Sequence, residues 1–151
     1  MFECCTVCFQ PYDNDERIKA NFVGRQTMCY KCYNEQPKVI ALDFDAVIAD
    51  YNGWKGADHK GNLLTGAREF IEELFNLGFD LYIVTSRPTK GIGKWLKLNN
   101  IDHFIKGVTN LKMAAFCYID DRAINFNNNF EETLEKIKTF TPWYKRKEMD
   151  N

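Results

Sequence analysis

The sequence lacks any hydrophobic run of the roughly 18 to 20 residues that a membrane-spanning helix needs. Its opening stretch, MFECCTVC, also lacks the basic segment and apolar core of a secretory signal. We therefore expect an intracellular, cytoplasmic protein with no membrane partner. A surplus of charge of one sign is missing too, since the formal net charge is -1. A chain so close to neutrality has no global field that would draw it to nucleic acid, which leaves only local patches for such contacts.

Cysteine is scarce along most of the chain and concentrated at its beginning. Cys5 and Cys8 form one C-x-x-C pair, and Cys29 and Cys32 form a second. Two such pairs at this separation are typical of a site where four thiolates hold one zinc ion tetrahedrally. Four thiolates leave no open position for water, so this zinc would be structural rather than catalytic. Cys4 is a spare that could replace Cys5.

Residues 1–36 resemble a zinc ribbon. A segment of this length cannot bury an adequate core by itself, but a zinc affinity of about 10 to 16 kcal/mol is enough to hold it folded. Zinc ribbons often contact nucleic acid or protein. Acidic and basic side chains are balanced in this segment, so a phosphate backbone is the less favoured partner and a protein partner stays open. Gln36-Pro37 marks a boundary between this zinc-ribbon-like module and a second domain, residues 37–151.

Strands and helices are predicted to alternate after Pro37. Apolar runs predict strands over residues 39–44, 80–85 and 116–119, with a shorter strand over 104–108. Apolar residues at helical spacing predict a helix with Thr65 as its N-cap and Gly78 as its stop. Similar spacing predicts helices over 92–96 and 134–140. The alternation predicts an α/β fold, a parallel Rossmann-like sheet with right-handed crossovers, flanked by helices.

Polar side chains follow three of the predicted strands at their carboxyl ends, where ligands bind in parallel sheets. They are Asp43 and Asp45 after the first strand, Thr85, Ser86 and Arg87 after the second, and Asp120 and Asp121 after the run FCYI. Carboxylates this close repel one another at neutral pH unless a cation lies between them. Oxygen ligands that leave room for water and phosphate suit Mg²⁺ better than Zn²⁺. The sequence therefore predicts a magnesium site here.

Residues 38–144 resemble the haloacid dehalogenase (HAD) superfamily of phosphohydrolases. The resemblance is carried by DFDAV at 43–47, IVTS at 83–86, Lys112 and YIDD at 118–121. In addition, GWKG at 53–56, VTNLK at 108–112 and YIDDRAINF at 118–126 are similar to a group of small members common in bacteria and phages. If a phage encodes the chain, the host cytoplasm would be its location. The resemblance implies a HAD sheet and a magnesium-dependent phosphatase.

The resemblance also implies a role for each matching residue. Asp43 would attack phosphorus and become an aspartyl-phosphate. Asp45 would protonate the leaving oxygen and then activate water, with its backbone carbonyl facing the metal. Thr85 would hydrogen-bond the transferring phosphoryl group, while Lys112 would neutralise it and position Asp43. The magnesium ion would be held by Asp43, Asp45 and the pair Asp120 and Asp121, either of which could be the direct ligand.

The segment between the first two motifs is too short for a large cap domain, which implies a small, uncapped member. An open site could admit a bulky substrate such as a polynucleotide end, unless the zinc module or a second subunit covers it. Trp54 could stack on a base or sugar or simply anchor its loop, and Arg87 and Arg122 could each contact phosphate or pair with an aspartate. The candidate substrate-binding residues are Ser86, Arg87, Trp54 and Asn110. Ala46 stands where the family most often has glycine.

Together, these features predict a magnesium-dependent phosphomonoester hydrolase that acts through an aspartyl-phosphate on a nucleotide or a polynucleotide end. A sugar phosphate or another small phosphate ester is the alternative substrate. An alternative of another class is a zinc-ribbon binding protein whose HAD-like domain is a non-catalytic scaffold.

Overall fold

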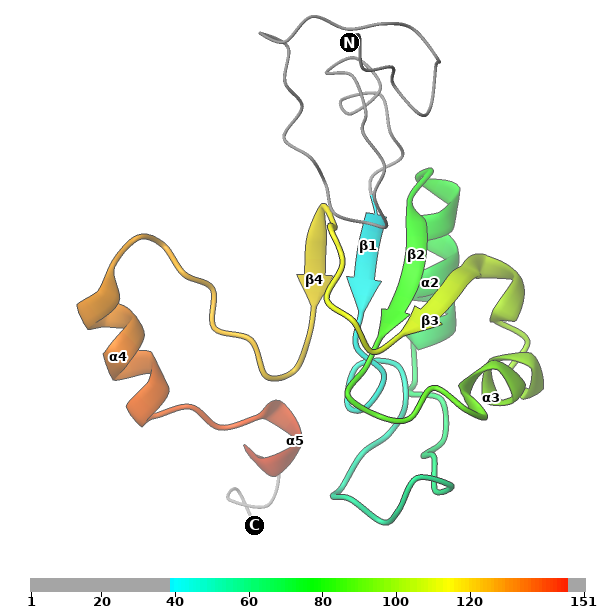
Figure 1. Ribbon diagram of the computed structural model, residues 1–151, viewed down its shortest axis with the longest axis horizontal. Coiled ribbons are helices and arrows are strands. Elements are labelled where there is room, and N and C mark those ends of the chain that lie inside the picture. The colour runs from blue at the N-terminus through cyan, green and yellow to red at the C-terminus, as the bar shows by residue number, and fades with distance from the viewer. Residues whose placement is uncertain (1–38, 147–151) are drawn as a thin grey trace, which may run out of the picture.

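The computed structural model describes residues 39–146, which form an α/β unit around one sheet (Figure 1). The zinc-ribbon-like module predicted for residues 1–36 lies outside the described residues, together with its predicted ligands Cys5, Cys8, Cys29 and Cys32. The strands are β1 (Val39–Leu42), β2 (Asp80–Val84), β3 (Ile105–Thr109) and β4 (Cys117–Ile119).

The four strands are parallel and lie in the order β3-β2-β1-β4. The chain moves from β1 to β2 to β3 in one direction and then returns past β1 to place β4 on its other side. Leu42 at the end of β1 is therefore paired with Ile119 at the end of β4. This topology brings the two acid-bearing strand ends next to each other, and the predicted parallel α/β sheet flanked by helices is confirmed.

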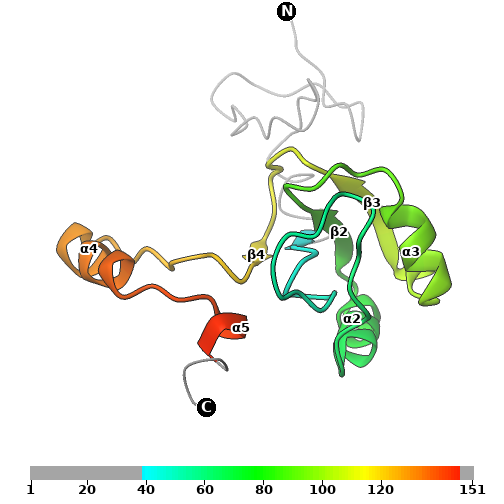
Figure 2. The same ribbon diagram turned by 90° about the horizontal axis from the view of Figure 1, so that it is seen from below.

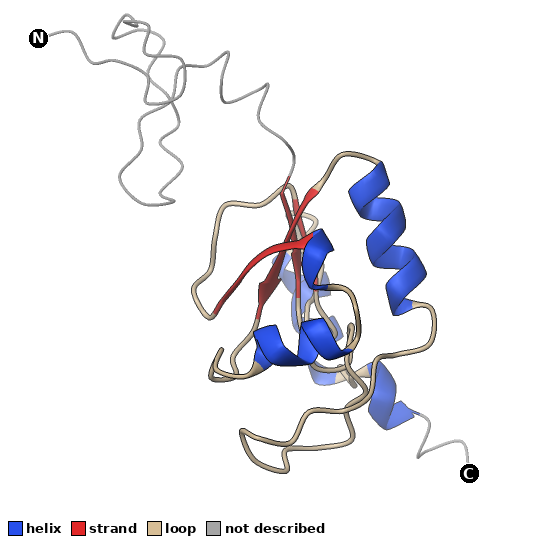
Figure 3. Cartoon of the chain, turned by 90° about the vertical axis from the view of Figure 1, so that its right-hand side faces the viewer, coloured by secondary structure: helices blue, strands red, loops and turns tan. Residues whose placement is uncertain are grey.

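The core lies between the sheet and the first helices. The helix α2 (Ala67–Asn76) runs behind the sheet in Figure 1, and Figure 3 shows it along one side of the strands. Ile71 of α2 and Ile83 of β2 are both fully buried in this core. The helix α3 (Ile92–Leu98) adds Trp95, whose ring meets the ring of Phe44 edge to face at 4.8 Å. This contact ties the helix to the turn that follows β1. A short 3-10 helix, η2 (Asp102–Phe104), leads into β3.

The ends of α2 show where the capping prediction succeeds and where it is wrong. Gly66, not Thr65, occupies the N-cap position, with φ 83° and no side-chain hydrogen bond. The helix stops at Gly78 as predicted, because this glycine has φ 85° and its N–H donates to the carbonyl oxygen of Phe75 at 2.9 Å. Glycine adopts such left-handed backbone at little cost.

Two helices follow β4. The first, α4 (Phe130–Lys138), lies apart from the sheet (Figures 1 and 2), and its N-cap Asn129 accepts a hydrogen bond from the N–H of Glu132 at 3.0 Å. The second, α5 (Trp143–Arg146), was not predicted. Trp143 donates its indole N–H to the carbonyl oxygen of Ala46 at 2.7 Å, which fastens α5 to the turn after β1. Within residues 39–146, no helix combines the length and the apolar character needed to cross a membrane.

Candidate active site

The chain turns sharply after β1, and the residues of the first acid motif build this turn. The N–H of Ala49 donates to the carbonyl oxygen of Phe44 at 2.9 Å. Ala46 is buried with φ 60°, the left-handed region that favours glycine. The N–H of Asp43 donates to the carbonyl oxygen of Ile119 at 2.9 Å, so the pairing of β1 with β4 continues through Asp43 and fixes its backbone.

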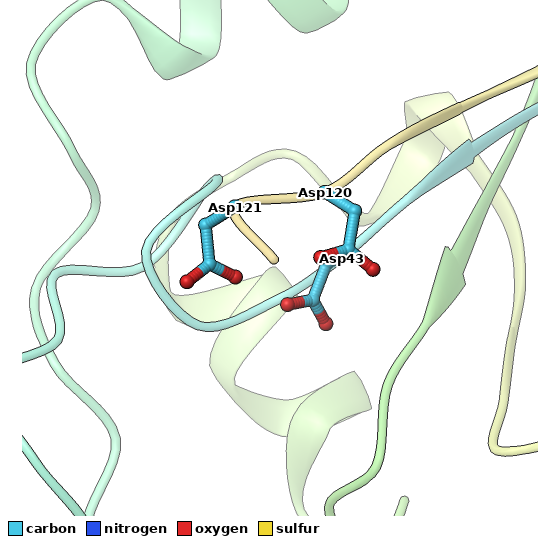
Figure 4. A group of neighbouring side chains, drawn as sticks. All are labelled: Asp43, Asp120 and Asp121. Atoms are coloured by element: carbon cyan, nitrogen blue, oxygen red, sulfur yellow. The ribbon is translucent and has the colours of Figure 1, made fainter. Parts of the chain in front are cut away.

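Three carboxylates meet at the carboxyl ends of β1 and β4. Asp43, Asp120 and Asp121 can each offer one oxygen such that all three oxygens lie within 4.8 Å of one another (Figure 4). Asp43 and Asp121 are half-buried, whereas Asp120 is exposed. The Oδ1 of Asp120 accepts a hydrogen bond from the N–H of Arg122 at 2.7 Å, which orients this side chain. The structure thus brings together three of the four predicted metal ligands, and the group could hold a metal ion.

Burial and mutual repulsion shift the protonation of this cluster. Burial raises the pKa of Asp43 from 3.8 to about 7; the N–H of Phe44 opposes the shift, and the charges of Asp120, Asp121 and Asp45 add to it. Burial likewise raises the pKa of Asp121, against the attraction of Arg122. A carboxyl with a pKa near neutrality holds a proton that a cation could displace. As free, ionised carboxylates, these side chains therefore lower the stability of the fold.

Asp45, the fourth predicted metal ligand, is engaged with Arg87. The Nε of Arg87 lies 2.5 Å from Oδ2 of Asp45, and the Arg87 side chain is only 3% exposed. The guanidinium also donates from Nη1 to the backbone oxygens of His59 at 2.9 Å and Gly56 at 3.3 Å. Within the described part of the chain, the buried Oδ1 of Asp45 finds no hydrogen-bond partner. Arg87 thus holds Asp45 and the loop over residues 56–59 in one arrangement.

The predicted residues at the end of β2 lie close to this pair. Thr85 is 4% exposed; its Oγ1 accepts from the N–H of Arg87 at 3.2 Å, and its own N–H donates to the carbonyl oxygen of Thr109 at 3.0 Å. Ser86 is exposed and lines the cavity that contains the aspartates. The second strand end therefore joins the acid cluster through Ser86 and Arg87, whereas Thr85 is buried and is not among the described residues that line the cavity.

Two predicted residues lie elsewhere. Lys112 is exposed, and its Nζ lies 5.8 Å from the centre of the Tyr118 ring. Asn110 is exposed as well. Neither is among the described residues that line the cavity over the aspartates.

An open cavity of about 190 Å³ contains the four aspartates, and a second cavity of about 300 Å³ adjoins it. Tyr51, Trp54 and Arg122 line both. The second cavity also includes Tyr144 and Lys145 from α5. Arg122 was expected either to contact phosphate or to pair with an aspartate, and its Nε lies 3.6 Å from Oδ2 of Asp121. Spacing along the sequence gives no signal for Tyr144, because the contact between Trp143 and Ala46 brings α5 there.

Comparison with known proteins adds one solved structure. No family model matches the chain, and no curated protein matches it. Among solved structures, the chain is similar to a conserved protein coded by a locus of Bacteroides thetaiotaomicron, with 19% sequence identity. The match has a TM-score of 0.48 and covers 68% of this chain and 91% of that chain. A likeness of this degree carries no argument about the reaction or the substrate.

Proposed function

We propose that residues 37–151 form a magnesium-dependent phosphomonoester hydrolase of the small, uncapped HAD type, acting through an aspartyl-phosphate on a nucleotide or a polynucleotide end in the cytoplasm. The observation that carries the proposal is the convergence of Asp43, Asp120 and Asp121, whose oxygens lie within 4.8 Å at the ends of two neighbouring parallel strands. Asp45 lies in the same open cavity.

The donor set fits a magnesium ion. Magnesium favours a few carboxylate oxygens and keeps positions for water and phosphate, and this cluster offers three carboxylates beside an open cavity. The raised pKa of Asp43 fits as well, because part of its cause is the charge of the neighbouring acids, which a cation would offset. When bound, the ion would neutralise phosphate charge and help to align the reacting groups.

Asp43 is the proposed nucleophile. One of its carboxylate oxygens forms a bond to phosphorus as the bond from phosphorus to the leaving oxygen breaks. The leaving oxygen takes a proton from Asp45, and Asp45 then takes a proton from the water that attacks the aspartyl-phosphate, which regenerates Asp43 and releases phosphate. The hydrogen bond from Asp43 N–H to Ile119 holds the nucleophile in place.

The ion pair with Arg87 fixes one oxygen of Asp45. Oδ2 is held by Arg87, while Oδ1 is buried and has no hydrogen-bond partner within residues 39–146, so the carboxyl would have to turn toward the cavity to exchange a proton with the leaving oxygen or with water. Arg87 is then a positioning residue for Asp45. Thr85 and Lys112 remain the proposed partners of the phosphoryl group, and Lys112 must exchange its contact with Tyr118 for the phosphate.

The test is phosphate release from a panel of nucleotides, 5′-phosphorylated oligonucleotides and sugar phosphates. We expect release by the wild type with Mg²⁺, none with chelator, and a loss of roughly a thousandfold or more in Asp43→Asn. Asp58→Asn is the matched control, because Asp58 is exposed and does not line the cavity over the aspartates. Turnover that persists in Asp43→Asn would contradict the mechanism, and turnover limited to sugar phosphates would reject the proposed substrate.

We also propose that Cys5, Cys8, Cys29 and Cys32 bind one structural zinc ion, as their spacing predicts. The test is metal analysis of the purified full chain. About one zinc per chain is expected, and the amount should fall when Cys29 and Cys32 are both replaced by serine. A zinc content unchanged by that double substitution would reject the site.

A further inference from the structure

The two adjoining cavities differ in charge. Four aspartates line the one over the nucleophile, together with Arg87 and Arg122, so acidic side chains prevail there. Among the described residues that line the second cavity, none carries a carboxylate, whereas Arg122 and Lys145 both contribute positive charge. A cation and a phosphoryl group suit the first, and an anionic group suits the second, because each wall favours charge of the opposite sign.

The second cavity is also rich in aromatic surface. Trp54 is 58% exposed, and the guanidinium of Arg87 lies 4.8 Å from its ring centre, so a cation over one face holds the ring in place. Tyr51 meets Tyr144 edge to face at 5.3 Å, and Arg122 donates from Nη2 to the hydroxyl of Tyr144 at 2.7 Å. These contacts fix aromatic walls contributed by two separate segments, the loop after β1 and α5, before any ligand binds.

Resting on the proposed phosphatase function, we infer that this second cavity is the leaving-group subsite, where a nucleobase stacks on Trp54 and Tyr51 while a following phosphate lies against Lys145. The shared wall of Tyr51, Trp54 and Arg122 makes the two cavities continuous. A substrate could therefore place its terminal phosphate at Asp43 and its base in the adjoining cavity. Aromatic stacking of a base tolerates any base, so the subsite recognises nucleotides as a class.

The experiment measures binding to Asp43→Asn in the presence of Mg²⁺ by titration calorimetry, so that no ligand is consumed. The three probes are ribose 5-phosphate, adenosine 5′-monophosphate and a 5′-phosphorylated dinucleotide of adenosine. We expect the mononucleotide to bind about tenfold more tightly than the sugar phosphate. The dinucleotide should bind several-fold more tightly still, because its second phosphate reaches Lys145.

The substitutions Trp54→Leu and Tyr51→Leu, each added to Asp43→Asn, should reduce the preference for the mononucleotide over ribose 5-phosphate. Lys145→Gln should remove the preference for the dinucleotide. Matched controls are Phe70→Leu, an exposed aromatic on α2, and Lys138→Gln, an exposed lysine on α4. Two separate aromatic variants keep the test valid if one of them fails to fold.

Equal affinity for the mononucleotide and ribose 5-phosphate would overturn the inference, as would a preference that survives in both aromatic variants. A dinucleotide preference that is absent, or unchanged by Lys145→Gln, would overturn the assignment of the second phosphate. Phosphate release by the wild type is measured separately. If it fails while the base preference and its loss in the variants hold, the proposed hydrolysis is wrong and the cavity stands as a nucleotide-binding site.

Discussion

The carboxyl group of Asp43 destabilises the metal-free fold at neutral pH. Its pKa rises from 3.8 to about 7 on folding, chiefly by burial and further through its acidic neighbours. Between these two values the folded state holds a proton that the unfolded state has released, so the free energy of unfolding falls as the pH rises through this window. The full decrease in the free energy of unfolding is reached only above pH 7.

The isosteric substitution Asp43→Asn removes this titration. Both proteins are measured in chelator at pH 4.5 and at pH 8. Over this interval, we expect the melting temperature of the wild type to fall by several degrees more than that of Asp43→Asn. Asp43→Asn should therefore be the more stable protein at pH 8. Groups away from the cluster titrate alike in both proteins, so the difference between the two curves reports Asp43 together with its coupling to Asp120 and Asp121. Parallel curves from thermal unfolding followed by circular dichroism would contradict the shifted pKa.

Gly61 is required by a close approach of two backbone segments. A Cβ added at this position would overlap the carbonyl oxygen of Asp50 and lie 2.7 Å from its carbonyl carbon. The carbonyl oxygen of Gly61 also accepts the indole N–H of Trp95 at 2.8 Å. Gly61→Ala must therefore move the loop that borders the site, and we expect it to lower the free energy of unfolding by about 3 kcal/mol.

Gly93 offers the matched control for that measurement. It lies inside α3, and a Cβ there would meet nothing within 4 Å. Gly93→Ala should therefore raise the free energy of unfolding by roughly 0.5 to 1 kcal/mol through helix propensity. Urea unfolding of both variants checks the pair, and a tolerated Gly61→Ala would show that the loop does not pack as described.

At the scale of the elements, the sequence predicted what local patterns determine. The strands β1, β2, β3 and β4 were predicted from apolar runs, and α2, α3 and α4 from apolar spacing, because both patterns follow directly from burial on a sheet or a helix face. The N-cap of α2 was misassigned because the helix begins one residue later than predicted, which places the left-handed Gly66 rather than Thr65 at the N-cap. The four-residue α5 was missed, since tertiary contacts rather than periodicity place it.

The candidate site likewise combines residues that the sequence could predict with contacts that it could not. Asp43, Asp120 and Asp121 could be predicted because parallel strand ends converge at one edge of a sheet. The partner of Arg87 could not be chosen between substrate phosphate and an aspartate, because that choice depends on the fold of residues 56–59 around its guanidinium. Ala46 has φ 60°, in the left-handed region that favours glycine, and the sequence alone did not reveal this conformation.

The attachment of α5 can be tested through Trp143. Trp143→Phe keeps an aromatic ring but removes the indole N–H that donates to Ala46. We expect a loss of about 1 kcal/mol in the free energy of unfolding. If Tyr144 and Lys145 serve the adjoining cavity, nucleotide affinity should fall as well. The measurement is urea unfolding together with calorimetric titration of adenosine 5′-monophosphate, and an unchanged result in both would show that α5 is not held by this bond.

At the scale of the whole molecule, the sheet order explains how one small unit can hold opposite charges side by side. The return of the chain past β1 sets β4 beside it and concentrates the aspartates at that edge. The chain after β4 then brings α5 back to the turn after β1, with Tyr144 and Lys145 at the neighbouring cavity. An acidic region for a cation and a basic aromatic region for an anion thus share one wall.

Magnesium binding should couple this arrangement to global stability. A ligand that binds only the folded state raises the free energy of unfolding by about 1.4 kcal/mol at ten times its dissociation constant. Because the ion must displace the proton on Asp43, whose pKa is about 7, its affinity should increase about tenfold between pH 6 and pH 8. We therefore expect Mg²⁺ to raise the melting temperature of the wild type by a few degrees at pH 8 and much less at pH 6. Asp58→Asn should respond as the wild type does, whereas Asp43→Asn, which keeps Asp120 and Asp121 but has no proton to displace at position 43, should show a weaker response with little dependence on pH. A wild-type response to Mg²⁺ that is independent of pH, or an equally large response in Asp43→Asn, would mean that the ion binds outside the aspartate cluster.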